Sequence, residues 1–69
     1  MELYKLIGKK FTKEELENEI EGMGYDILGE FEYYWNVIDI YDDIAIETMI
    51  KISDMSNYNG LIKVIDIEY

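Results

Sequence analysis

The stretch FTKEELENEIEGMG, residues 11–24, decides the fold because it carries the local signals of one short amphipathic helix. Thr12 is a suitable N-cap, and Glu15 three residues later completes a capping box. The apolar positions that recur at helical spacing are Leu16, Ile20 and Met23. Gly24 is a natural left-handed stop. The stretch therefore predicts a helix over about residues 13–23, with one face turned toward a sheet.

Glutamates crowd the rest of this predicted helix. Five of them fall within residues 14–21, a length of about 12 Å, or one charge per ~2.4 Å. On a helical wheel one flank of the apolar stripe carries Glu14, Glu17 and Glu21, and the other flank carries Glu15 and Glu19. Like charges four residues apart oppose helix formation by a few tenths of a kcal/mol. The crowding is comparable to that of duplex DNA, which carries one phosphate charge per ~1.7 Å.

Residues 30–43, EFEYYWNVIDIYDD, interleave acids with aromatic and aliphatic side chains and hold no positive charge. The apolar positions are odd up to Val37 and even from Ile38 onward. Because side chains alternate along a strand, this change of phase requires a turn or a bulge. We expect two short strands, at about 30–35 and 37–42, with a single bent strand as the alternative, and a turn at 42–43.

The rest of the chain predicts a hairpin. Ile44, Ile46, Thr48, Ile50 and Ile52 alternate cleanly, as in a half-buried strand. Asn59-Gly60 is a strong hairpin signal, and residues 61–69 read as the last strand. A two-residue loop at 59–60 would place Ile52 opposite Ile67 and Lys51 opposite Glu68.

Residues 2–7 read as a short first strand that ends at Gly8. The whole chain, residues 1–69, therefore predicts a single acidic α+β domain of order β-α-β-β-β-β. One helix packs on a mainly antiparallel sheet of four to five strands. A helix of about 16 Å cannot cover such a sheet, so we expect apolar side chains on the other face and a homodimer that covers them.

The composition narrows the possible partners. The chain has 69 residues, a net charge of −10, six lysines, no arginine, no cysteine and no histidine. Such a field repels nucleic acid and anionic membranes and attracts cationic partners, so we expect no direct nucleic-acid or membrane binding. The basic cluster is Lys5, Lys9, Lys10 and Lys13. We expect it to be a solvated end or a counter-charge to a second subunit. Neither a signal-peptide pattern nor a membrane-length apolar run is present, so we expect a cytoplasmic protein.

Catalytic equipment is sparse. The hydroxyl groups have no histidine or cysteine to activate them, so we expect no enzyme, no catalytic residue and no cofactor. Hard oxygen ligands for a divalent cation gather at Asp39, Asp42, Asp43 and Glu47, but their spacing does not match a calcium-binding loop. A solvated acidic turn is the preferred interpretation, so we predict no metal site; a divalent-cation-binding domain is kept as an alternative.

The chain is small, has no cysteine or proline, and clusters Glu and Asp beside Tyr and Trp. In these features it resembles the small acidic host-takeover proteins of phages. That group includes DNA mimics, and the nearest likeness is the HU inhibitor of a Bacillus phage. The resemblance carries no motif over, but it implies a competitive protein–protein inhibitor that works without a cofactor.

Charge crowding and resemblance together predict a DNA-mimicking inhibitor of a basic host protein, such as a histone-like protein. The carboxylates expected to bind this partner are Glu14, Glu17, Glu21, Glu30, Glu32, Asp39, Asp42 and Asp43. The alternative is a small adaptor domain that binds through an aromatic face containing Tyr34 and Trp35.

Overall fold

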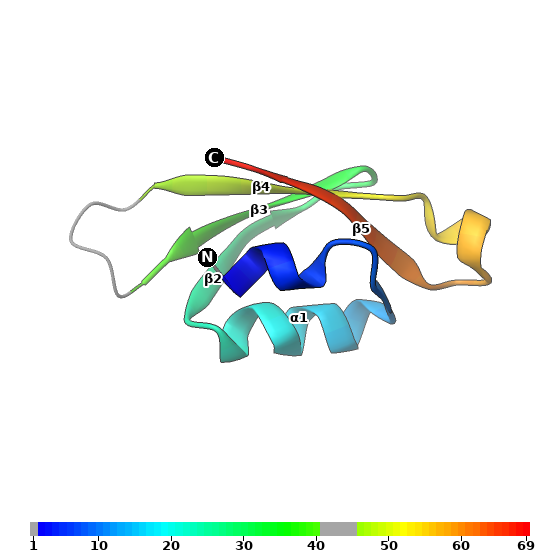
Figure 1. Ribbon diagram of the computed structural model, residues 1–69, viewed down its shortest axis with the longest axis horizontal. Helices are drawn as coiled ribbons and strands as arrows, with labels where there is room; N and C mark the ends of the chain where they lie inside the picture. The colour runs from blue at the N-terminus through cyan, green and yellow to red at the C-terminus, as the bar shows by residue number, and fades with distance from the viewer. Residues whose placement is uncertain (1, 41–45) are drawn as a thin grey trace.

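A computed structural model describes residues 2–40 and 46–69 of the chain. In these ranges the chain forms one α-helix, five strands and two 3-10 helices (Figure 1). In chain order they are η1 (Glu2–Leu6), β1 (Lys10–Phe11), α1 (Lys13–Gly22), β2 (Tyr25–Glu30), β3 (Tyr34–Asp39), β4 (Glu47–Ile52), η2 (Met55–Tyr58) and β5 (Ile62–Glu68). The strands form one antiparallel sheet of order β1-β5-β4-β3-β2. The predicted α+β class and the order β-α-β-β-β-β are confirmed.

Helix α1 begins and ends where its local signals place it. The Thr12 hydroxyl oxygen accepts a hydrogen bond from the Glu15 backbone N–H at 3.1 Å. The Glu15 carboxylate accepts one from the Thr12 N–H at 2.8 Å, so the predicted capping box is present. Gly24 follows the helix with a φ of 90°, a conformation that favours glycine.

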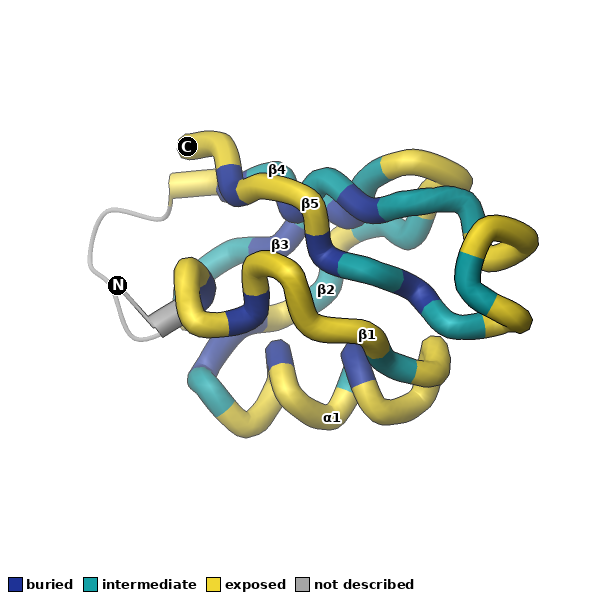
Figure 2. The backbone as a smooth tube through the Cα atoms, turned by 45° about the vertical axis from the view of Figure 1, so that its right-hand side comes forward, coloured by how far each residue is buried: buried dark blue, intermediate teal, exposed yellow. Residues whose placement is uncertain are grey.

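The core lies between the curled sheet and a layer made of α1 and η1 (Figures 1 and 2). Leu16 and Ile20 of α1 are completely buried, and Met23 packs against the same core. The sheet supplies Trp35, Val37, Ile50, Ile52, Ile62, Val64 and Ile67. The prediction that one face of the helix meets the sheet is therefore confirmed.

The predicted strand over residues 2–7 is wrong, because these residues form η1. Leu3 and Leu6 are three residues apart, which matches the three-residue turn of a 3-10 helix, and both are buried in the core. Gly8, with a φ of 86°, then redirects the chain, and the short strand β1 follows at Lys10–Phe11.

The predicted division of residues 30–42 into two strands is also wrong. Strand β3 runs without a break through Trp35 and Val37, which both face the core. Its partner β2 lies at Tyr25–Glu30, earlier than expected. Phe31 and Tyr33 belong to the turn between these strands and are half exposed. Their alternation with Trp35 is therefore not the alternation of a strand, although it has the same spacing. The turn predicted at 42–43 lies outside the described residues.

Strands β4 and β5 pair, but not in the predicted register. Ile50 lies opposite Ile67, and Lys51 lies opposite Asp66. The connection holds η2 as well as Asn59 and Gly60, so it is longer than a two-residue loop. The shift of two residues keeps Ile67 on its predicted face, because the period of a strand is two. A further register shift between Lys51 and Ile52 then turns Val64 to the core and leaves Ile65 exposed.

The outer part of β5 has an irregular edge. Strand β1 pairs with only Lys63 and Ile62 of β5, and the register shifts near Ile65. Just beyond the shift, the Asp66 carboxylate accepts a hydrogen bond from the Ile67 backbone N–H at 2.9 Å.

Candidate functional site

The carboxylates of α1 divide between two flanks, as the helical wheel predicts. Glu14, Glu17 and Glu21 lie on one flank of the buried stripe formed by Leu16 and Ile20. Glu14 and Glu21 are exposed, and Glu17 is half-buried. These three residues are called the acidic flank below.

Glu30 at the end of β2 joins the acidic flank to the sheet. Its carboxylate lies 3.3 Å from the Lys13 ammonium, and its side chain is 23% exposed. It also hydrogen-bonds with the Glu17 carboxyl group, which raises the pKa of Glu17; burial and the Glu30 charge add to this effect, and Lys13 opposes it. Two acids therefore share one lysine, and the group keeps negative charge.

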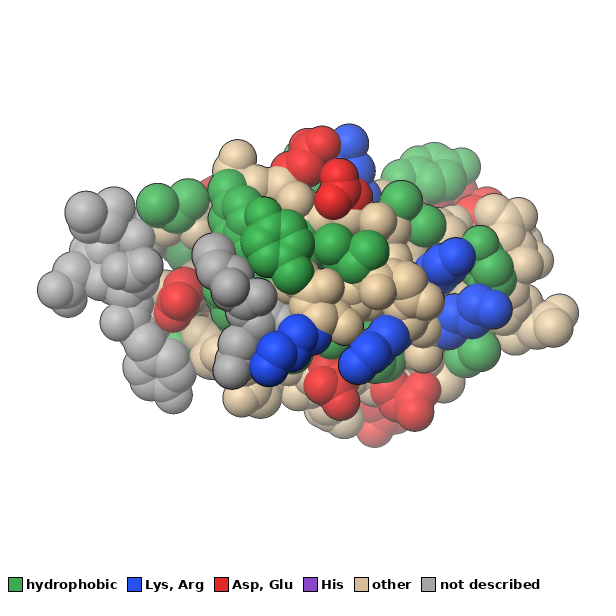
Figure 3. Space-filling view, in the orientation of Figure 1, with side chains coloured by type: hydrophobic (Ala, Val, Ile, Leu, Met, Phe, Trp, Pro, Cys, Tyr) green, Lys and Arg blue, Asp and Glu red, His purple; other side chains and the backbone are tan. Residues whose placement is uncertain are grey.

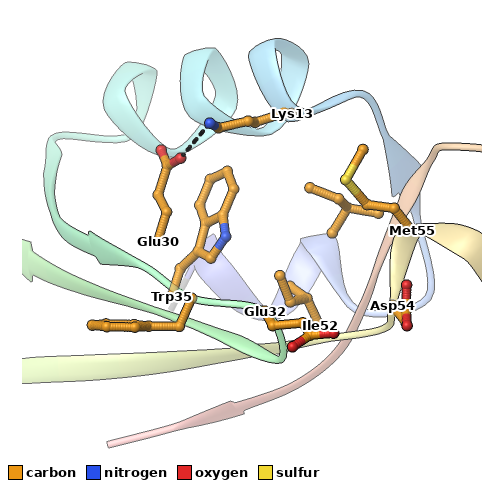
Figure 4. Close-up of a pocket in the computed structure, with 9 residues that line it drawn as sticks. Lys13, Glu30, Glu32, Trp35, Ile52, Asp54 and Met55 are labelled. Atoms are coloured by element: carbon orange, nitrogen blue, oxygen red, sulfur yellow. Dashed lines mark ion pairs between the residues drawn. The ribbon is translucent and has the colours of Figure 1, made fainter.

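A pocket of about 270 Å³ opens next to Glu30 (Figure 4). It is lined by Lys13, Glu30, Phe31, Glu32, Trp35, Ile52, Asp54, Met55 and Ile62. These residues come from α1, from all strands except β1, and from the connections β2–β3 and β4–β5. Trp35 is only 2% exposed. The pocket therefore combines apolar walls with carboxylates from three separate segments.

Backbone contacts fix the β2–β3 turn on one side of the pocket. The Phe31 N–H donates to the Tyr34 carbonyl oxygen at 2.9 Å, and the Ile52 N–H donates to the Tyr33 carbonyl oxygen at 2.9 Å. The Phe31 ring stacks on Tyr34 with centroids 4.8 Å apart. A Cβ at Gly29 would lie 2.6 Å from the Phe31 ring, so glycine at this position lets the ring lie over the strand.

Asp54 occupies the other side of the pocket, where it caps η2. Its carboxylate accepts a hydrogen bond from the Ser56 N–H at 2.9 Å. The charges of Glu32, first, and of Asp54 raise the pKa of the Tyr33 phenol. The Glu32 and Asp54 carboxylates therefore both lie near the Tyr33 phenol, although 22 positions separate them in the sequence.

The structure brings together some of the predicted binding residues and not others. Glu17 contacts Glu30, and Glu30 and Glu32 line one pocket. Asp39 pairs with Tyr25 at the opposite end of the β2–β3 hairpin, about 13 Å along the strand from the Glu30 pair. It therefore does not extend the acidic surface around the pocket. Asp42 and Asp43 lie outside the described residues.

Asp54 was missed from the sequence. A signal for it exists, because an Asp two residues before a Ser and five before Asn59-Gly60 is a typical cap of a tight turn. What the sequence alone does not give is that this turn and the β2–β3 turn line the same pocket.

The predicted aromatic face with both Tyr34 and Trp35 is not formed. The two residues are neighbours on β3 and point to opposite sides of the sheet, with Trp35 in the core. The outer side of the sheet is mixed in character. It carries half-buried Tyr34, Ile38 and Met49 next to Asn36, Lys51 and Glu68.

Two lysines gather at the β1–β5 edge of the sheet, whereas Lys13 lies beside the acidic flank. Lys10 and Lys63 face each other across β1 and β5, and their ammonium groups lie 4.7 and 5.5 Å from the centre of the Tyr58 ring. Lys5 and Lys9 are exposed. Figure 3 shows lysines across the middle of this face, with Asp and Glu side chains below them, where α1 lies. Other Asp and Glu side chains lie at the top of the same view, next to a lysine.

Two further features concern the described part of the chain, residues 2–40 and 46–69. No group of three His, Cys, Asp or Glu side chains there is arranged to hold a metal ion. No helix there has the length and apolarity that crossing a membrane requires. The candidate metal ligands at 42 and 43 lie outside these ranges.

Comparison of the chain with protein-family models, with curated proteins and with solved structures gives no match.

Proposed function

We propose that the chain binds a basic, DNA-binding protein through its acidic surface and so keeps DNA away from that protein. The observation that carries the proposal is the gathering of carboxylates on one flank of α1 and at the adjoining end of β2. Glu14, Glu17 and Glu21 share this flank, and Glu30 hydrogen-bonds with Glu17. Glu30 alone in this surface is ion-paired with a lysine in the described part of the chain.

The spacing of charges on the acidic flank supports mimicry of one DNA strand. Three charges within the eight residues 14–21 give one charge per about 4 Å of helix. A single DNA strand rises ~3.4 Å per phosphate. A surface that binds phosphates with lysines and arginines would therefore find comparable spacing on α1, and Glu30 and Glu32 extend the negative surface onto the sheet.

A competition assay tests this proposal. Fluorescent duplex DNA is bound to the histone-like protein HU and to a panel of other basic DNA-binding proteins, and displacement by the chain is followed by anisotropy. We expect displacement from at least one of them, with at least a tenfold loss of potency between about 50 and 200 mM salt. Displacement that does not respond to ionic strength, or no displacement from any member of the panel, would contradict the proposal.

Matched variants locate the surface. The triple change Glu14→Gln, Glu17→Gln and Glu21→Gln neutralises the acidic flank, and we expect it to abolish displacement. The control neutralises three other exposed acids, Glu15, Glu19 and Glu47. If both triple variants lose the same potency, overall charge and not the acidic flank is responsible.

The homodimer is a separate proposal. Its support is the half-exposed apolar side chains on or directly after η1 and β5, namely Tyr4, Ile7, Ile65 and Tyr69. The Tyr4 and Tyr69 rings pack edge to face with centroids 5.6 Å apart. Light scattering across a concentration series checks it, and the change Tyr69→Ser should shift the mass toward the monomer.

A further inference from the structure

Trp35 is a buried side chain with an unused hydrogen-bond donor. The residue is 2% exposed, yet its indole N–H has no acceptor among the described residues. Among the described residues, no side-chain nitrogen or oxygen that is fully buried lacks a hydrogen-bond partner. The unpaired indole nitrogen therefore keeps some exposed surface. Trp35 lines the pocket, and in Figure 4 the indole nitrogen lies on the side of the ring that faces Met55. The donor is therefore available to a molecule in the pocket.

Two carboxylates lie on the opposite side of the pocket from the Lys13–Glu30 ion pair. Figure 4 places that ion pair on the α1 side of the Trp35 ring and places Glu32 and Asp54 on the other side. Neither Glu32 nor Asp54 forms an ion pair with a lysine of the described chain. The pocket thus offers negative charge from two segments that are held by their own backbone contacts.

The walls between these polar groups are apolar. Ile52, Ile62 and Met55 line the pocket together with the Trp35 ring. A volume of about 270 Å³ is just below the ~300–1,000 Å³ of typical small-molecule sites. The space suits one long side chain better than a cofactor or a nucleotide.

We infer that this pocket receives an arginine side chain of the protein partner. The guanidinium group lies between Glu32 and Asp54, the methylene stem packs on Met55 and Ile52, and the Trp35 N–H donates to a carbonyl oxygen of the same partner segment. The inference rests on the proposed function for the kind of partner, and it adds a specific anchor to an otherwise diffuse charge attraction.

Arginine fits this pocket better than lysine. Its guanidinium is planar, more weakly hydrated than an ammonium group, and has several N–H donors that can reach two carboxylates at once. It also packs favourably on aromatic rings. A lysine would reach the same carboxylates as a point charge and would lose more hydration among the apolar walls.

The test uses small probes and the single tryptophan of the chain. The indole N–H resonance is followed in ¹H–¹⁵N spectra during titration with N-acetyl-arginine methylamide, which holds both the guanidinium and a carbonyl acceptor. We expect a saturable shift of this resonance. The lysine analogue should bind several-fold more weakly, and the citrulline analogue, which keeps the shape without the charge, should cause no saturable shift. A citrulline response equal to the arginine response would overturn the inference.

Variants assign the carboxylates. Asp54→Asn keeps a residue that can cap η2, and Glu32→Gln changes an exposed turn position, so both should fold. Each should raise the dissociation constant of the arginine probe about fivefold, as for a favourable exposed ion pair. Glu19→Gln, on the other flank of α1, should leave it unchanged. Equal effects of the three changes would sink the inference.

The two proposals fail separately. If the arginine probe binds in the pocket but the chain displaces no DNA from any basic protein, the inference stands and the proposed function fails. If the chain displaces DNA and neither Glu32→Gln nor Asp54→Asn alters the probe titration, the proposed function stands and the arginine pocket is refuted.

Discussion

Two glycines at the end of α1 differ in what they contribute. Gly22 is the last helical residue, and a Cβ there would meet nothing within 4 Å. Gly24 has a φ of 90°, where a side chain is strained. We expect Gly22→Ala to raise the free energy of unfolding by about 0.5–1 kcal/mol and Gly24→Ala to lower it by at least ~1 kcal/mol. Urea denaturation of the two variants measures both values, and changes of the same sign would contradict this assignment.

Glu17 gives the stability a dependence on pH. The hydrogen bond with Glu30 raises the pKa of Glu17 in the folded state, so the folded protein holds this proton more tightly than the unfolded chain does. The contribution of Glu17 is therefore fully present below its unfolded pKa and is lost as the pH rises through the raised value.

Glu17→Gln should remove this dependence, because an amide can still donate to Glu30 but carries no charge. We expect the variant to gain stability relative to the parent chain between pH 4 and pH 7, measured as the urea midpoint at each pH. The control is Glu19→Gln, which removes the same charge from α1. In the described structure Glu19 has no hydrogen bond to a second carboxylate. A gain of the same size in both variants would show that general charge reduction is the cause.

At the scale of elements, α1 depends on its cap more than most helices do, because like charges along it oppose helix formation. Thr12→Ala removes the acceptor for the Glu15 N–H and should lower the free energy of unfolding by about 1 kcal/mol. Thr12→Ser keeps the hydroxyl and should retain most of the stability. Thermal unfolding followed by circular dichroism compares the two, and equal losses would mean that the cap does not contribute.

The elements that could be predicted are those with signals inside their own residues. The helix has its cap, its apolar stripe and its glycine stop within fourteen positions, so its predicted range nearly matches Lys13–Gly22. The strands around Trp35 were placed wrongly because Phe31 and Tyr33 continue the alternation into a turn. Only the hydrogen bonds of that turn, including the one from Ile52 to Tyr33, define where β3 begins.

Among the proposed binding residues, too, local geometry predicts some positions and long-range pairing decides the others. Glu14, Glu17 and Glu21 share a flank because helical geometry alone fixes it. The position of Glu32 and Asp54 around one pocket depends on how two connections approach each other at the end of the sheet, and no spacing in the sequence contains that information. Asp39 was grouped with them by its proximity in the sequence, whereas the antiparallel pairing of β2 and β3 carries it to the other end.

At the scale of the whole molecule, a net charge of −10 on 69 residues acts against folding by self-repulsion. Raising NaCl from about 0.02 to 1 M shortens the screening length to ~3 Å and should raise the unfolding temperature. Each kcal/mol recovered corresponds to about 4–8 °C for a domain of this size. Differential scanning calorimetry measures the shift. KCl should raise the unfolding temperature by the same amount, because screening depends on ionic strength. An unfolding temperature that falls with salt would contradict the role of self-repulsion.

The short strand β1 also has a consequence for solubility. It covers only two residues of β5, so the edge from Ile65 to Glu68 has no strand beside it in the described chain. Open edges are where chains recruit one another into fibrils. Here the Ile67 amide is already occupied by the neighbouring carboxylate, and the bulge near Ile65 breaks the flat template. An incoming strand would meet a blocked donor flanked by two acids, so the exposed border of the sheet resists polymerisation without a covering element.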